Sequence, residues 1–190
     1  RDTNGNIMGT LFVDKLDPQS GTSLEIGSSG DTITIPSGAT ITNSGTATGF
    51  GEANTPNFHA KTSSQSISAS TSTVVVYSAE DFDTSSLYNT SNGRFTVDAN
   101  TTGKYFFYAA VKYASSSISR NDLTINKNGT AVLRTEFGNS TSYPTVLVSG
   151  MVNLSSSGDY VEVKVNQNDG TKSLSGESEG NFFGGFRVTS

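Results

Sequence analysis

The chain has 190 residues, of which 33% are hydrophobic and 15% charged, and its formal net charge is −5. It contains no cysteine, which excludes disulfides and thiolate metal sites. The negative charge argues against nucleic-acid binding, and no apolar run is long enough to insert across a membrane. Because its 11 Phe and 7 Tyr fall in periodic runs, we expect a folded β-protein.

The first fifty residues differ in composition from the rest. Short β-type runs such as Ile33-Thr34-Ile35 and Ala39-Thr40-Ile41 alternate with Gly/Ser turns, and Leu11-Phe12-Val13 precedes them. Each run is too short to form a core alone, so we expect residues 1–50 to be a β-rich, fibre-like stem that is ordered only when three chains share it. The alternative is a flexible Gly/Ser-rich linker. A chain that begins at Arg1 is expected to be a fragment or a processed product.

Residues 51–57 read as a hinge, and residues 58–190 as a globular head. Regularly spaced strands with Gly-containing turns between them, and no amphipathic helix, predict a sandwich or barrel. Asn128-Gly129 between two apolar runs predicts a two-residue hairpin. The expected strands are Phe58–Thr62, Ser72–Tyr77, Arg94–Val97, Gly103–Tyr113, Asp122–Asn126, Ala131–Phe137, Thr145–Leu154, Tyr160–Asn166 and Phe182–Val188.

Two kinds of strand can be distinguished. From Tyr160 to Val165 apolar and polar residues alternate, which predicts one buried face and one solvated face carrying Tyr160, Glu162 and Lys164. The runs 105–111 and 182–186 do not alternate, so both of their faces should be buried. A small sandwich has one interior, and the second face must therefore meet another chain or the stem. The residues expected in the core or the subunit interface are Phe58, Tyr105, Phe106, Phe107, Tyr108, Phe182, Phe183 and Phe186.

The head resembles the C1q-like globular domain of the C1q and tumour necrosis factor-like jelly-roll superfamily, over about Phe58 to Val188. Each motif is weak alone, but the six occur in the family's order and spacing. They are Phe58-His59-Ala60, Phe82-Asp83 followed by Leu87-Tyr88-Asn89 and Gly93-Arg94-Phe95-Thr96-Val97, Gly103-Lys104-Tyr105-Phe106-Phe107, Leu123-Thr124-Ile125-Asn126-Lys127-Asn128-Gly129, Gly158-Asp159-Tyr160-Val161 and Phe182-Phe183-Gly184-Gly185-Phe186.

This resemblance implies an all-β fold: a jelly-roll β-sandwich head that forms a threefold trimer, here preceded by the short β-rich stem. The sequence departs from the family in lacking Trp, a Pro before the Gly-x-Tyr strand and a collagen stalk. The stem resembles repeats in fibre and structural proteins of tailed bacteriophages.

Catalysis has little support in the sequence. His59 is the only histidine, it lies in an expected strand, and no Gly-x-Ser-x-Gly elbow is present. The carboxylate pairs Asp81/Asp83 and Glu177/Glu179 would suit glycan hydrolysis, but we expect both pairs in solvated polar loops. Some relatives of the family bind calcium. Asp81, Asp83, Asp122 and Asp169 offer oxygen donors without forming a loop motif, so no metal ligand and no cofactor is assigned.

Recognition is expected in three polar loops, at residues 113–121, 138–144 and 167–179, where aromatic, amide and charged groups occur together. The candidate residues are Tyr113, Arg120, Tyr143, Asn168 and Lys172.

The sequence therefore predicts a non-enzymatic homotrimer on the external surface of a phage virion. It would contact other virion proteins through its N-terminal side and a host-surface glycan or protein through its head. The alternatives are an extracellular or surface-displayed bacterial binding protein and a fibre-borne glycan depolymerase.

Overall fold

The computed structural model describes residues 14–45, 55–114, 118–140 and 143–189. The chain divides into two units, residues 1–48 and 49–190. Residues 14–45 contain no helix or strand, and their large apolar side chains, such as Ile33 and Ile35, are exposed. The expected run at 11–13 and residues 51–54 of the expected hinge lie outside the described residues. The three-chain stem stays a prediction.

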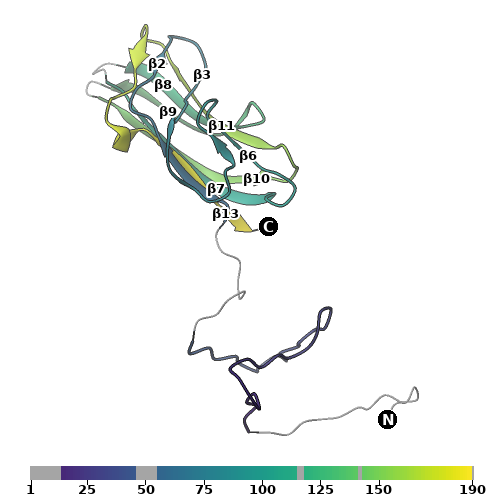
Figure 1. Ribbon diagram of the computed structural model, residues 1–190. Helices are drawn as coiled ribbons and strands as arrows, with labels where there is room; N and C mark the ends of the chain where they lie inside the picture. The colour runs from purple at the N-terminus through teal and green to yellow at the C-terminus, as the bar shows by residue number, and fades with distance from the viewer. Residues whose placement is uncertain (1–13, 46–54, 115–117, 141–142, 190) are drawn as a thin grey trace. The chain divides into compact units, whose positions relative to one another are not determined.

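Two large antiparallel sheets make up most of the second unit (Figure 1). The five-stranded sheet has the order β10-β7-β13-β1-β4, and the six-stranded sheet has the order β5-β6-β11-β8-β9 with β3 added beside β11. A small third sheet pairs β12 with β2. The strands are β1 (Asn57–Lys61), β2 (Ser66–Ile67), β3 (Thr73–Val74), β4 (Ala79–Asp83), β5 (Tyr88–Asn89), β6 (Arg94–Thr96), β7 (Gly103–Lys112), β8 (Ile118–Lys127), β9 (Thr130–Ser140), β10 (Thr145–Leu154), β11 (Tyr160–Gln167), β12 (Lys172–Ser173) and β13 (Phe182–Thr189).

The predicted all-β sandwich is confirmed. Within the described ranges the one helical element is a 3-10 turn, η1 (Ser178–Gly180), and no helix there is long and apolar enough to cross a membrane. The hairpin between β8 and β9 is also confirmed, with φ of 50° at Asn128 and 83° at Gly129. Two successive residues with positive φ give the turn a twist that matches the flanking strands.

Core and surface alternate along the long strands. Every second residue of β7, from Tyr105 to Val111, is buried between the sheets, and Phe58 of β1 stacks on Phe95 of β6 with ring centroids 4.7 Å apart. Phe183 of β13 meets Phe58 edge-on at 5.0 Å. These interlocking rings tie the five-stranded sheet to the six-stranded sheet.

One prediction about β11 is wrong in part. Val161, Val163 and Val165 are buried as expected, but Glu162, predicted on the solvated face, has a side chain only 1% exposed. Arg94 and Lys164 enclose its carboxylate, at 2.9 Å and 3.0 Å respectively. Ion pairing therefore allows an acidic residue to be buried on a sheet face that the alternation assigned to solvent.

The chain enters the head beside its C-terminal strand. The backbone N–H of Arg187 in β13 donates to the carbonyl of Pro56 at 3.0 Å, immediately before β1. The start of β1 and the end of β13 thus lie side by side at one end of these two neighbouring, interior strands.

Candidate functional site

The outer face of the five-stranded sheet carries a set of large apolar side chains. Cross-strand pairing places them in rows, because residues opposite one another in an antiparallel pair point to the same side. Met151, Phe106 and Phe186 form one row across β10, β7 and β13. Leu147 lies opposite Ala110, which lies opposite Phe182. We call this surface the aromatic face, and it consists of Phe82, Phe106, Tyr108, Leu147, Met151, Phe182 and Phe186.

Rings on the aromatic face contact one another across strands. The centroids of Phe106 and Phe186 are 5.7 Å apart, and those of Tyr108 and Phe182 are 6.1 Å apart. Gly184 lies opposite Tyr108 and leaves room for its ring, since a Cβ at position 184 would be 2.5 Å from the Tyr108 hydroxyl oxygen. The glycine therefore permits a large ring to lie flat against the sheet.

The eight residues predicted for core or interface divide between the two sides of the sheet. Phe58, Tyr105, Phe107 and Phe183 are fully buried inside the sandwich and cannot line a subunit axis. The other four, Phe106, Tyr108, Phe182 and Phe186, are half-buried on the aromatic face.

Three members of the aromatic face were missed at the sequence level. Leu147 and Met151 are about half exposed. The sequence carried a signal for them, because in Thr145–Leu154 apolar residues occur at the outward-facing positions as well as at the buried ones. Phe82 is similarly exposed, but its neighbours in β4 are acidic and gave no strand signal.

A titratable cluster borders the aromatic face. The Nδ1 atom of His59 is 3.1 Å from the Tyr108 hydroxyl, and its Nε2 atom is 3.6 Å from an Asp81 oxygen. Asp81 also pairs with Lys61 Nζ at 2.7 Å. Burial lowers the pKa of His59 below its usual 6.5, although the Asp81 carboxylate opposes that shift. Burial raises the pKa of Tyr108.

The carboxylates Asp81 and Asp83 lie in a different setting from the one expected. Asp81 and Asp83 lie in strand β4 and not in a polar loop, so that expectation is wrong. Backbone hydrogen bonds to β1 define this edge strand, although its sequence has no apolar periodicity. Asp83 accepts backbone hydrogen bonds from Ser85 and Tyr88, which commits it to shaping the chain after the strand.

The loops predicted for recognition meet at one end of the sandwich. The backbone N–H of Tyr113 donates to the carbonyl of Pro144 at 3.0 Å, which joins the first loop to the second. The Ser119 hydroxyl donates to Asp169 at 2.7 Å, which joins the first to the third. Residues 115–117 and 141–142 of these loops lie outside the described residues.

Tyr113 is wrong as a surface recognition residue, because it is fully buried and donates its hydroxyl hydrogen to Asn121 at 2.9 Å. This burial raises the pKa of Tyr113. Tyr143 is 57% exposed and lines a hollow of about 300 Å³ with Lys112, Ala114, Ser175 and Glu177. Asn168 is exposed beside this end, and Lys172 is half-buried in β12. From the sequence, Tyr113 is expected in a loop because serine-rich residues follow it. Only tertiary packing shows that its ring is buried.

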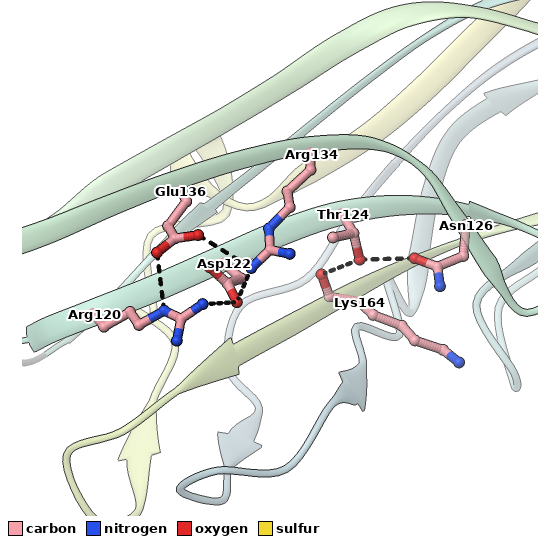
Figure 2. A network of polar contacts seen from close by, with 7 residues as sticks. All are labelled: Arg120, Asp122, Thr124, Asn126, Arg134, Glu136 and Lys164. Carbon is pink, nitrogen blue, oxygen red and sulfur yellow. Dashed lines mark hydrogen bonds and ion pairs between the residues drawn. The ribbon is translucent and has the colours of Figure 1, made fainter.

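Arg120 is not in a loop. It lies in β8, on the outer face of the six-stranded sheet, where its Nε donates to Glu136 at 2.9 Å (Figure 2). Arg134 contacts both Asp122, at 2.6 Å, and Glu136, at 3.1 Å. The hydrogen bond that Arg134 donates to the Asp122 carboxylate raises the pKa of Arg134. Two arginines and two carboxylates thus form a closed network on this face.

No group of three or more His, Cys, Asp or Glu side chains within the described residues is arranged to hold a metal ion. One of the possible calcium donors, Asp169, is engaged with another side chain. Asp169 binds Ser119, and hydrogen bonds from that serine lower the pKa of Asp169.

Comparison with known proteins agrees with the β-sandwich fold of the head. The sequence matches the family described as C1q domain over residues 57–188. Among solved structures, murine APRIL at pH 8.5 is 18% identical with a TM-score of 0.54, covering 70% of this chain and 98% of that chain. The globular domain of zebrafish complement 1qA is 19% identical with a TM-score of 0.49, covering 70% and 97%. No curated protein matches the chain.

Proposed function

Because the chain belongs to the C1q domain family, we propose that its head is a trimeric, non-catalytic binding module. The observation that carries the proposal is the aromatic face. C1q-like domains are binding and structural modules, and Asp81, Asp83 and His59 of this head contact other residues of the fold.

The aromatic face favours self-association. Its members include Leu147, 53% exposed, and Met151, 50% exposed, beside half-buried Phe and Tyr rings. Contiguous apolar surface of this kind is typical of protein interfaces. Fully burying one Leu or Phe side chain contributes about 1.5–3 kcal/mol, and threefold symmetry repeats each contact.

Recognition by the trimer is assigned to the loop end, where Tyr143 and Asn168 are exposed. The strands of the five-stranded sheet are committed to the sandwich and the aromatic face, while the loops present polar surface. Three identical heads on one stem would also bind with avidity, with a gain of about 10²–10⁴ where geometry permits.

The biological setting that we propose is the external surface of a tailed-phage virion, as a fibre or decoration protein. The cysteine-free composition and the Gly/Ser-rich residues 1–50 with their short Ile-containing runs support it. Exposed Leu24, Ile26, Ile33, Ile35 and Ile41 are the side chains that three chains would share in the stem. Hydrogen-exchange protection of residues 14–45 in the assembled protein tests the stem.

Two measurements test the proposal. Light scattering of the full chain at micromolar concentration is expected to give three times the 19.9 kDa chain mass, and a monomer mass would overturn it. Electron microscopy of phage particles labelled with antibody to the head is expected to show label on virions. Label on bacterial surfaces alone would replace the virion setting by the bacterial one. Incubation with host polysaccharide should release no new reducing ends.

A further inference from the structure

A small hollow lies on the outer face of the six-stranded sheet, away from the aromatic face and from Tyr143. Its volume is about 170 Å³, and strands β8, β9 and β11 supply most of its walls. The lining residues are Ser72, Asp122, Thr124, Asn126, Ala131, Arg134, Lys164, Val165 and Asn166.

Two buried acceptor atoms belong to this lining. Asp122 Oδ1 and Asn166 Oδ1 are both buried, and neither has a hydrogen-bond partner among the described residues. Asp122 of β8 lies directly opposite Asn166 of β11, so the two side chains are neighbours on the same face. A buried acceptor without a donor is costly, so such a pair marks a place where a ligand or water supplies hydrogen.

The other oxygen of Asp122 is fully engaged. Its Oδ2 accepts from Arg134 at 2.6 Å and from Arg120 at 3.3 Å, which fixes the carboxylate plane (Figure 2). The side chain of Asp122 is 13% exposed. Further along the same strand, β8, the Thr124 hydroxyl donates to Asn126 at 2.7 Å, so this part of the lining is also held in place.

The charges around the hollow define what it can bind. Arg134 and Lys164 line it, which disfavours a metal ion or an ammonium group. Asp122 disfavours an anion in the same way. The ligand must be neutral, must donate to Asp122 and Asn166, and can accept from the two cationic side chains. A hydroxyl group both donates and accepts, and neighbouring hydroxyls satisfy all four groups.

We propose that this hollow binds one neutral monosaccharide unit of a glycan through adjacent hydroxyl groups. Its volume is below the roughly 300–1,000 Å³ of pockets for drug-sized ligands, which restricts it to about one sugar ring. The inference rests on the proposed binding role of the head and assigns a ligand class to a sheet face. Because the hollow and the aromatic face belong to different sheets, trimer assembly through the latter leaves the hollow open.

The test is a titration of the ¹⁵N-labelled full chain with D-glucose, D-galactose, N-acetyl-D-glucosamine and L-rhamnose, with ethanolamine and CaCl₂ as controls. Saturable shifts of the Thr124, Lys164 and Asn166 amides are expected with at least one sugar and with neither control. Asn166→Leu, which removes the acceptor at similar size, should weaken binding about tenfold, while Asn166→Asp should retain it. Asn100→Leu, at an exposed position between β6 and β7, is the matched control and should bind as the wild type does, whereas Asn168→Leu tests the loop end.

The outcomes separate this inference from the proposed function. A trimer that shows no shifts at the hollow with any sugar would mean that the hollow holds water only, and would overturn the inference while the trimer stands. Loss of sugar binding in Asn168→Leu but not in Asn166→Leu would overturn the inference too, as would amide shifts produced by CaCl₂ alone. A monomer that still binds sugar through Asn166 would support the inference and overturn the trimer.

Discussion

Arg94 Nε donates a 2.9 Å hydrogen bond to Oε2 of Glu162, a carboxylate that is 99% removed from solvent although it lies on the outer face of its sheet. The guanidinium covers the carboxylate and continues over the Tyr160 ring, with Cζ 4.1 Å from the ring centroid. Lys164 contacts the second oxygen at 3.0 Å. Glu162 therefore joins β6 to β11 through a shielded charge pair.

Removal of this carboxylate should destabilise the head. Glu162→Ala leaves Arg94 and Lys164 without their partner, and loss of a hydrogen bond to a charged group costs about 1.5–3 kcal/mol. Glu162→Gln keeps the volume and one acceptor and should lose less. Urea unfolding measures both. Glu136→Ala is the matched control, because the Glu136 side chain is 47% exposed in its ion pair with Arg120. This variant should change stability less than Glu162→Ala. Equal effects at the two sites would contradict the shielding argument.

Gly185 should tolerate no side chain. A Cβ at this position would lie 2.5 Å from Phe107 Cδ1 and 2.9 Å from the carbonyl oxygen of Phe106. Gly185→Ala therefore overpacks the core, with an expected loss of about 1–3 kcal/mol in the free energy of unfolding. Thermal unfolding measures it.

Gly150→Ala is the control for this overpacking. Its Cβ would meet only the flexible end of Leu133, at 2.8 Å from Cδ2, so the leucine can move aside. We expect a smaller loss than for Gly185→Ala. The reverse order would show that backbone proximity does not determine the cost.

The fold was largely predictable because its long strands carry strong local signals. Thr145–Leu154 was predicted with the observed bounds, and the turn at Asn128 was predicted from its two residues. The short edge strand β4 was missed because it has no apolar alternation and its position depends on backbone pairing with β1.

The candidate site was less predictable. Tyr113 and Arg120 were expected in loops, yet tertiary contacts bury the first and place the second in β8. Asp122 and Asn166, the two acceptors of the hollow, are 44 positions apart and meet only through strand pairing. Local patterns predict strands and their buried faces, but they do not specify which polar side chains meet across a sheet.

A charge on the aromatic face should prevent assembly without unfolding the sandwich. Leu147→Glu places a carboxylate in the proposed interface, where burial without a partner is unfavourable. Because Leu147 is 53% exposed in the single chain, the fold should persist. We expect a monomer mass by light scattering together with an unchanged β-sheet circular dichroism spectrum.

Val132→Glu controls for the effect of charge alone. Val132 is 46% exposed and lies in β9 of the other sheet, so this variant should remain trimeric. If both variants dissociate, or if neither does, the aromatic face is not the interface.

His59 should make the protein less stable as the pH falls below neutrality. Burial lowers its pKa in the folded chain below the 6.5 of the unfolded chain, so the unfolded chain binds the proton more readily. The contribution of His59 is therefore fully present above about pH 6.5 and is lost as the pH falls from there through the folded pKa. Asp81, which favours the protonated ring, reduces this loss, whereas Lys61 increases it.

His59 is the only histidine, so the window between pH 7.5 and 5.5 reports on this side chain. Melting temperatures across that window should decline in the wild type and should change less in His59→Gln. The Leu147→Glu monomer should also decline less than the wild type, because assembly over the aromatic face would remove His59 further from water. Parallel declines in the wild type and His59→Gln would show that another group is responsible.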